Sequence, residues 1–166
     1  MRKYRDIDCL AFNSYNENFV LSNMYPCTLI YNGITFCGVD HLFHYLLFDG
    51  FKEVQDKLLK CNGVNGNFQA KKIGEKFESL LGEINSKLKY DLLYKCLKIK
   101  CEQCELFRKK LIDSIGLFLV EFAWWGDKEF GCVLENGCFI GKNACGRLMM
   151  KVRAELILEK MEKDEV

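Results

Sequence analysis

The chain has 166 residues, of which 49% are hydrophobic and 28% are charged, and its formal net charge at pH 7 is +1. This length fits one domain with a sizeable core, and the apolar content excludes a disordered chain. The near balance of 24 basic and 23 acidic residues excludes a general electrostatic field that would attract nucleic acid or membranes. A local basic patch is the alternative that this balance leaves open. No apolar run approaches the ~20 residues of a membrane span, and the opening MRKYRDIDCL lacks the apolar core of a signal peptide. We therefore expect a soluble, cytoplasmic protein without a membrane partner.

The first predicted elements are a hairpin and a helix. The pair Asn32-Gly33 lies between two apolar runs and predicts a tight turn. Its strands should cover Thr28 to Tyr31 and Ile34 to Phe36. A helix is expected directly afterwards, beginning at Val39 or Asp40, because an aspartate is favourable near a helix start.

The remainder of the chain is mainly helical in pattern. From Asn67 to Leu111 apolar residues recur at spacings of three and four. A second Asn-Gly pair, residues 136–137, predicts another hairpin. The last helix should run from about Asn143 to Glu159, with an apolar stripe formed by Cys145, Leu148, Met149, Val152 and Leu156. The charged tail, residues 157–166, ends in EKMEKDEV and should fray into solvent. These elements predict a single α+β domain over residues 1–166, mainly helical, with short β-hairpins.

Ten cysteines are many for such a chain. Cys101 and Cys104 form one Cys-x-x-Cys pair, but no second pair and no histidine follow at zinc-finger spacing. Without a signal peptide, a disulfide framework is disfavoured as well. We therefore expect reduced, partly buried thiols.

The segment GVDHLFHYLLF, residues 38–48, holds the chain's only two histidines. Asp40, His41 and His44 would share one side of a helix. A catalytic site, a metal site and the wall of a binding pocket are all compatible with this pattern. No further acid or histidine is placed with them by sequence, so we expect neither a metal nor a cofactor. The plainer alternatives are a helix cap for Asp40 and a buried structural role for His41.

Near the end, FIGKNACGRLMMKVR places Gly141, Lys142, Asn143 and Gly146 at the predicted start of the last helix. Free backbone N–H groups at a helix start attract anions, and glycine lets a ligand approach closely. Lys142 would then meet a phosphate. The plainer alternative is that Gly141 makes the turn and Asn143 caps the helix.

Two adjacent tryptophans stand just before this segment, in WWGD, residues 124–127. Such side chains stack on bases or contact a ribose, and they equally serve as core or as the wall of a pocket.

The motifs LSNMYP, GVDHLFHYLLF, and WWGD followed by FIGKNACGRLMMKVR resemble, in this order, the NADAR family, also called YbiA-like. The family pattern reads roughly S-N-F, a strand pair, S-E-H-Y-F-Q-x-x-K-F, then W-G and G-K-N-x-L-G-x-x-L-M-x-x-R. The segment LKIKCEQCELFRKKL is also similar to the family's L-x-x-K-F-x-Q-x-x-x-L-x-x-x-L, and the resemblance spans about residues 10–156. It implies an ADP-ribose-type ligand, because the family handles NAD- and ADP-ribose-related nucleotides. The implied ligand-binding residues are Ser22, Asn23, Asp40, His41, His44, Trp125, Gly126, Lys142, Asn143 and Gly146.

The departures from the family pattern concern its chemistry. Asp40 stands where the family has Glu, and His44 replaces Gln. Leu47 replaces the Lys that the family is proposed to use to capture the opened ribose as a Schiff base, and an isobutyl group cannot replace an amine in covalent catalysis. The segment LVEFAWWGD is also about four residues shorter than the family's loop, which usually supplies an Asp before W-G. A misplaced or lost acid–base group costs on the order of 100- to 10,000-fold in rate.

The resemblance therefore implies a protein that binds an ADP-ribose-derived nucleotide and sequesters it, for example a TIR-type immune signal in viral counter-defence, with catalysis weakened or lost. The alternative is an N-glycosidase that cleaves the ribose–base bond of ADP-ribosylated guanine or of riboflavin-pathway intermediates. In that case Asp40 would be the acid–base group and water the nucleophile, and ADP-ribosylated nucleic acid would be an alternative partner. A purely structural helical domain would leave three ordered polar motifs unexplained. The sequence predicts no oligomeric state.

Overall fold

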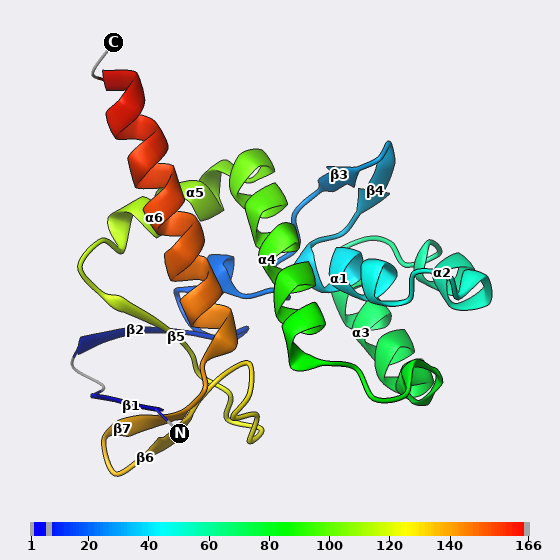
Figure 1. The fold of residues 1–166 in the computed structure, drawn as a ribbon, viewed down its shortest axis with the longest axis horizontal. Coiled ribbons are helices and arrows are strands. Elements are labelled where there is room, and N and C mark those ends of the chain that lie inside the picture. Colours follow the sequence, from blue (N-terminus) through cyan, green and yellow to red (C-terminus); the bar gives the residue numbers. More distant parts are fainter. Residues whose placement is uncertain (1, 6–7, 165–166) are drawn as a thin grey trace. The chain divides into compact units, whose positions relative to one another are not determined.

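The computed structural model describes residues 2–5 and 8–164, which form two compact units (Figure 1). Unit 1 combines Met1–Ser22 with Leu106–Val166, and unit 2 consists of Asn23–Glu105. Both contain helices and strands, so the predicted α+β class, mainly helical with short hairpins, is confirmed.

Unit 2 contains a β-hairpin followed by helices. Its elements are β3 (Leu29–Tyr31), β4 (Ile34–Phe36), α1 (Val39–Leu47), α2 (Lys52–Leu58), α3 (Gly66–Phe77), the 3-10 helix η3 (Glu78–Leu81) and α4 (Ser86–Gln103). The hairpin is confirmed in its predicted place: Leu29 pairs with Phe36, and Asn32 at the turn has a φ of 50°. The predicted start of α1 is confirmed too, but its N-cap is Gly38, so the cap alternative for Asp40 is wrong.

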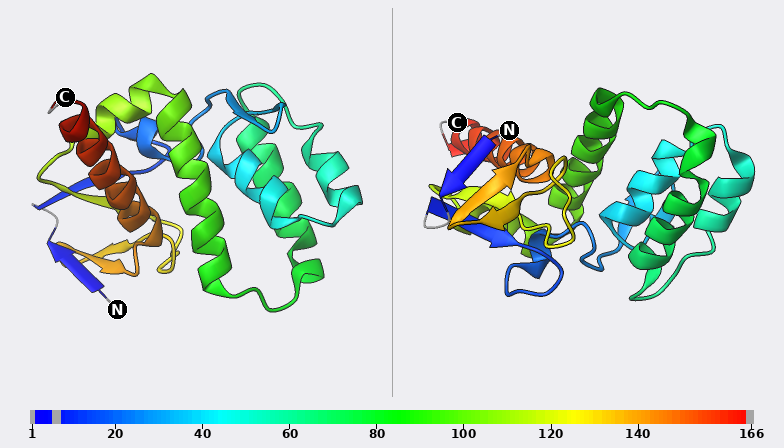
Figure 2. Two further views of the ribbon diagram at one scale, coloured as in Figure 1. Left: turned by 45° about the horizontal axis from the view of Figure 1, so that its top comes forward. Right: turned by 90° about the horizontal axis from the view of Figure 1, so that it is seen from below.

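The helices of unit 2 share an apolar core. Helix α1 packs against both α3 and α4, as the two views of Figure 2 illustrate for the cyan and green segments. Burial of apolar side chains on these helices is the main source of their stability, because short helices are marginal in water. Helices cover most of the predicted stretch from Asn67 to Leu111, with interruptions at residues 82–85 and at Cys104.

Unit 1 contains small sheets and a long helix. Its elements are β1 (Arg2–Arg5), β2 (Cys9–Phe12), the 3-10 helix η2 (Phe19–Leu21), α5 (Glu105–Asp113, which begins in unit 2), β5 (Phe118–Glu121), β6 (Val133–Glu135), β7 (Cys138–Gly141) and α6 (Ala144–Asp164). Strands β1, β7 and β6 form an antiparallel sheet, and β2 pairs in parallel with β5. The predicted hairpin at residues 136–137 is confirmed as β6–β7, and α6 packs against β5.

The predicted start of α6 is confirmed, but the helix ends later than predicted. Cys145, Met149 and Val152 are buried, and Leu148 and Leu156 are half-buried, so the predicted stripe faces protein. The prediction that EKMEKDEV frays is wrong as far as Asp164, since the helix continues to that residue. Glutamate, lysine and methionine are good helix formers, which accounts for the extension. The end of the tail, residues 165–166, lies outside the described residues.

The ten cysteines are free thiols, and several are buried, including Cys101 and Cys104. The prediction of reduced, partly buried thiols is confirmed. Among the described helices, none is long and apolar enough to cross a membrane.

Candidate functional site

The start of α1 is held in place by Asn67, a buried residue in the first turn of α3. Its Oδ1 accepts a hydrogen bond from the backbone N–H of His41 at 3.0 Å. Its Nδ2 lies within 3.2 to 3.3 Å of the backbone oxygens of Met24, Tyr25 and Cys37. One amide thus connects α1, α3 and the chain on either side of the hairpin. Sequence reasoning missed Asn67 because these partners are distant along the chain.

Both ring nitrogens of His41 form hydrogen bonds with backbone groups. Its Nδ1 accepts from the backbone N–H of Cys37 at 3.1 Å, so Nε2 carries the proton and donates to the Leu58 oxygen at 2.9 Å. Burial lowers the pKa of the ring, although the bond to Leu58 opposes this effect. Because both ring nitrogens are already engaged, the geometry favours a role of His41 in holding α1. Contact between His41 and a ligand stays a prediction.

Asp40 occupies the second position of α1. Its backbone N–H donates to the Asn23 oxygen at 3.3 Å, which brings together two of the predicted site residues. Burial of the carboxyl raises its pKa to about 6, while the charges of Lys71 and Lys100 lower it and that of Glu75 raises it further. A carboxyl that exchanges its proton near pH 6 suits general acid–base chemistry at neutral pH.

Lys100, on α4, is a site residue that the sequence analysis did not assign. Its side chain is fully buried, and its Nζ lies 5.4 Å from the centre of the Tyr25 ring. A fully buried lysine is rare, so its position marks a candidate functional site. The available signal was its match to the lysine in the family's L-x-x-K pattern. Periodicity alone assigns a lysine to the solvent side of a helix.

His44 lies one helical turn after Asp40 and packs tightly against α3. A Cβ at Gly74 would collide with Nδ1 and Cε1 of the imidazole, so glycine permits this close approach. Nδ1 is buried and has no hydrogen-bond partner among the described residues. Burial lowers the pKa of His44 to about 4, and Lys71 adds to this effect, so the ring is neutral at pH 7. His44 can therefore act as a polar neutral group but not as a cation.

Leu47, where the family has its lysine, lies in an apolar environment. It packs against a cluster formed by Phe48, Val54, Leu58, Cys61 and Ala70. This part of α1 therefore offers no amine to a substrate. Within the described ranges, no group of three or more His, Cys, Asp or Glu side chains is arranged to hold a metal ion.

In unit 1, the backbone N–H groups at the start of α6 are already used. Those of Lys142 and Asn143 donate to the oxygens of Lys128 and Gly131 at 2.7 and 3.2 Å. The next two, at residues 144 and 145, donate to the oxygens of residues 129 and 130 at 3.1 and 2.9 Å. An anion site at a helix start needs free N–H groups, so that explanation for this motif is wrong for these four amides.

Asn143 and Gly146 dock α6 onto β5. Asn143 is fully buried, with a φ of 53°. Its Oδ1 accepts from the Glu121 N–H at 3.1 Å, and its Nδ2 donates to the Leu119 oxygen at 2.8 Å. A Cβ at Gly146 would collide with that same Leu119 oxygen. These contacts explain the two residue types by packing, without reference to a ligand.

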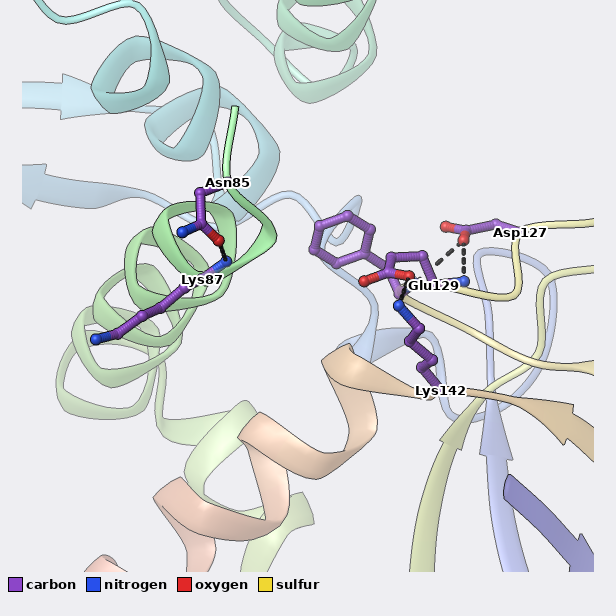
Figure 3. A network of polar contacts seen from close by, with 6 residues as sticks. Asn85, Lys87, Asp127, Glu129 and Lys142 are labelled. Atoms are coloured by element: carbon purple, nitrogen blue, oxygen red, sulfur yellow. Dashed lines mark hydrogen bonds and ion pairs between the residues drawn. The ribbon is translucent and has the colours of Figure 1, made fainter. Parts of the chain in front are cut away.

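Lys142 is paired with an acid (Figure 3). Its Nζ lies 2.6 Å from Oε2 of Glu129, and 58% of the lysine side chain is exposed. Asp127 folds back on the same loop, where its Oδ1 accepts from the N–H groups of Glu129 and Phe130 at 2.8 and 3.1 Å. A phosphate would have to compete with Glu129 for Lys142.

The tryptophans of unit 1 are surface residues. Trp124 is 61% exposed and Trp125 49%, so the alternative that they form core is wrong. Gly126 closes the turn after them, with its N–H donating to the Ala123 oxygen at 3.0 Å. Ser22 is buried, with its Oγ 3.3 Å from that of Ser14.

The predicted site residues thus fall into two groups. Unit 2 holds Asn23, Asp40, His41 and His44, and unit 1 holds Ser22, Trp125, Gly126, Lys142, Asn143 and Gly146. The expectation that all ten line one cavity stays a prediction.

No family model matches the chain, and no curated protein matches it. Among solved structures, it is similar to the NMR structure of the E. coli protein YbiA, with a TM-score of 0.76 over 93% of this chain and 89% of that one. The chain has the YbiA fold. Sequence identity in this match is 23%, so the likeness is one of fold. The resemblance that the order of the motifs implied is confirmed at that level.

Proposed function

We propose that the protein binds an ADP-ribose-derived nucleotide in a NADAR-like pocket and sequesters it, with catalysis weakened or lost. The supporting observation is a contrast along α1. Asp40 keeps an acid whose pKa is raised to about 6, whereas Leu47, two turns later, packs into an apolar cluster. The face that would bind a sugar has kept its polar group, and the position of the family's amine has become apolar.

The charges around Asp40 suit this class of ligand. A carboxylate accepts hydrogen bonds from ribose hydroxyls, and lysines bind phosphate oxygens as point charges. Lys71 and Lys100 are close enough to Asp40 to lower its pKa. A TIR-type immune signal derived from NAD carries both the ribose and the phosphate that these groups would recognise, which makes viral counter-defence a setting for such a protein.

The weakening of catalysis follows from the same side chains. Without an amine at Leu47, the opened ribose cannot be captured as a Schiff base by α1. Aspartate also holds its carboxyl about one methylene further back than the family's glutamate. A displacement near 1 Å at a reacting group costs about 100-fold in rate.

The alternative function is an N-glycosidase, favoured by the raised pKa of Asp40. The carboxylate would take a proton from the water that attacks the ribose carbon, and the bonding pair of the broken C–N bond would leave with the base. ADP-ribosylated guanine, free or within nucleic acid, and riboflavin-pathway intermediates are the substrates that fit this reaction.

A screen of NAD-derived ligands by thermal shift, followed by mass spectrometry of each recovered ligand, tests both functions. Sequestration predicts a ligand that stabilises the protein and is recovered intact. Release of the base supports hydrolysis, and in that case Asp40→Asn should abolish turnover while affinity is largely kept. The matched control is Asp49→Asn, since Asp49 is exposed and follows the same helix.

Restoring the family pattern is the reverse test. Asp40→Glu combined with Leu47→Lys should introduce or raise N-glycosidase activity if these two groups are the defect. Because Leu47 packs against apolar side chains, a lysine there will cost stability, and Leu47→Met serves as the volume-matched control.

A further inference from the structure

Helix α6 of unit 1 has apolar residues on two sides. One side carries the buried stripe, which includes Met149 and Val152. A second stripe begins at Ala154 and continues with Leu158 and Met161, at spacings of four and three residues, towards the end that is red in Figure 1. Ala154 is exposed, and Leu158 and Met161 are 58% and 56% exposed. At 3.6 residues per turn these three residues share one face, opposite the buried stripe, here called the outer face of α6.

The outer face changes the sign of its charge along the helix. Arg147 and Lys151, both exposed, continue the stripe towards the start of α6 at the same spacings. Glu162, also exposed, lies on the same face near the other end. The lysines of the last turns, Lys160 and Lys163, fall on the opposite side of the helix. The outer face is therefore basic in its first half, apolar in the middle and acidic near its end.

A second copy of the chain is complementary to this face when the two α6 helices run antiparallel. Alternating spacings of four and three are those of the seam between paired helices. If Ala154 of one copy lies against Leu158 of the other, then Lys151 lies against Met161, with Glu162 beside it, and symmetry repeats each contact. The methylene stem of Lys151 would cover Met161, and its ammonium would meet the carboxylate of Glu162. A parallel pair would instead place each charge beside its own copy, where like charges repel.

We propose that the outer face of α6 is the interface of an antiparallel homodimer. From Arg147 to Glu162 the face is about four turns long. Two such faces bury on the order of 1,000 Å² in total, at the low end for specific interfaces. The dimer is therefore weak and forms at high protein concentration. It uses residues of unit 1 alone and does not depend on the proposed nucleotide.

Sedimentation equilibrium of the full chain, from micromolar to near-millimolar concentration, measures the dimer, with a reductant present to keep the ten thiols free. Leu158→Lys should raise the dissociation constant about 100-fold or more, because both copies lose a leucine from the apolar seam. Leu106→Lys is the matched control, since Leu106 on α5 is 61% exposed and should leave association unchanged. Circular dichroism verifies that each variant is folded.

A charge swap tests the antiparallel arrangement. Lys151→Glu alone and Glu162→Lys alone should each weaken the dimer about 2- to 30-fold, since each breaks two exposed ion pairs per dimer. The double variant places opposite charges together again and should recover the wild-type dissociation constant. A dimer that Leu158→Lys weakens but that neither single charge variant changes overturns the antiparallel pairing. A wild-type chain that stays monomeric throughout, or a dimer that Leu158→Lys leaves unchanged, overturns the interface.

Discussion

The two units use their motif residues in opposite ways. At the start of α6, the side chain of Asn143 and four successive backbone amides are consumed by hydrogen bonds within unit 1, and Gly146 fits against a backbone oxygen. On α1, by contrast, Asp40 has a raised pKa and His44 has a buried nitrogen without a partner among the described residues. Unsatisfied polar groups cost stability, so a fold that retains them is a candidate for function there.

A match to the family's motif therefore does not by itself show that a residue binds the ligand. The residues of α6 are explained by the packing of this helix on β5, and a change there should act on folding first. On α1, burial shifts the pKa values of Asp40 and His44. A change at either residue should therefore act on chemistry and on the pH dependence of stability. The following variants test this contrast.

The largest effect is expected from Gly146→Val, which places side-chain atoms against the Leu119 oxygen. It should lower the free energy of unfolding by about 3 kcal/mol, as overpacking of a closed contact does. Urea denaturation measures the change. Arg147→Val is the control, because Arg147 is exposed on the same helix and should cost only about 0.5 kcal/mol. Equal losses for the two variants would show that α6 does not depend on this close approach.

Asp40→Asn should raise the free energy of unfolding at pH 7 by about 2 to 3 kcal/mol. The folded state raises the pKa of this carboxyl from 3.8 to about 6, so its contribution to stability is present below pH 3.8 and is lost as the pH rises through 6. The advantage of the variant should therefore shrink as the pH falls towards 4. Denaturation of both proteins across this range measures it, and an advantage independent of pH would contradict the account.

His44→Gln, which restores the family's residue, should reduce the acid sensitivity of the fold. Because the folded state lowers the pKa of His44 from 6.5 to about 4, its contribution is present above pH 6.5 and is lost as the pH falls through 4. Between pH 7 and pH 5 the wild type should lose about 1 to 2 kcal/mol more stability than the variant. Identical pH profiles would show that His44 is well hydrated in the folded state.

The smallest effect is expected from Lys142→Gln. The ion pair with Glu129 is largely exposed, so its loss should change the free energy of unfolding by less than about 1 kcal/mol. Nucleotide affinity should fall only a few-fold, since Glu129 already occupies the lysine. A calorimetric loss of 100-fold or more would place Lys142 directly on a phosphate and would reverse our interpretation of α6.

Local signals in the sequence were sufficient for much of the fold. Both Asn-Gly pairs form hairpin turns, with φ values of 50° and 49° at their asparagines, because asparagine and glycine tolerate this conformation. The starts of α1 and α6 and the order of the motifs were also readable, and the order led to the YbiA fold.

What the sequence did not reveal depends on long-range contacts. Periodicity assigns a lysine to solvent, yet Lys100 is fully buried, with the Tyr25 ring 5.4 Å from its Nζ and its charge acting on Asp40 of α1. The anion site at α6 was predicted because the partners of its amides, the oxygens of residues 128–131, are placed by a loop whose shape has no local signature. Asn67 escaped notice for the same reason, since its partners lie 26 to 43 residues away.

The most direct test of the central claim is recovery of the ligand after incubation with the wild-type protein. ADP-ribose and ADP-ribosylated guanosine are incubated separately with excess protein, and the bound and free fractions are analysed by mass spectrometry. The account predicts that the nucleotide is retained by the protein and recovered intact, with weak or absent release of the base. Rapid release of guanine by the unmodified protein would contradict it, and would show that the loss of the family's lysine at Leu47 does not disable the chemistry.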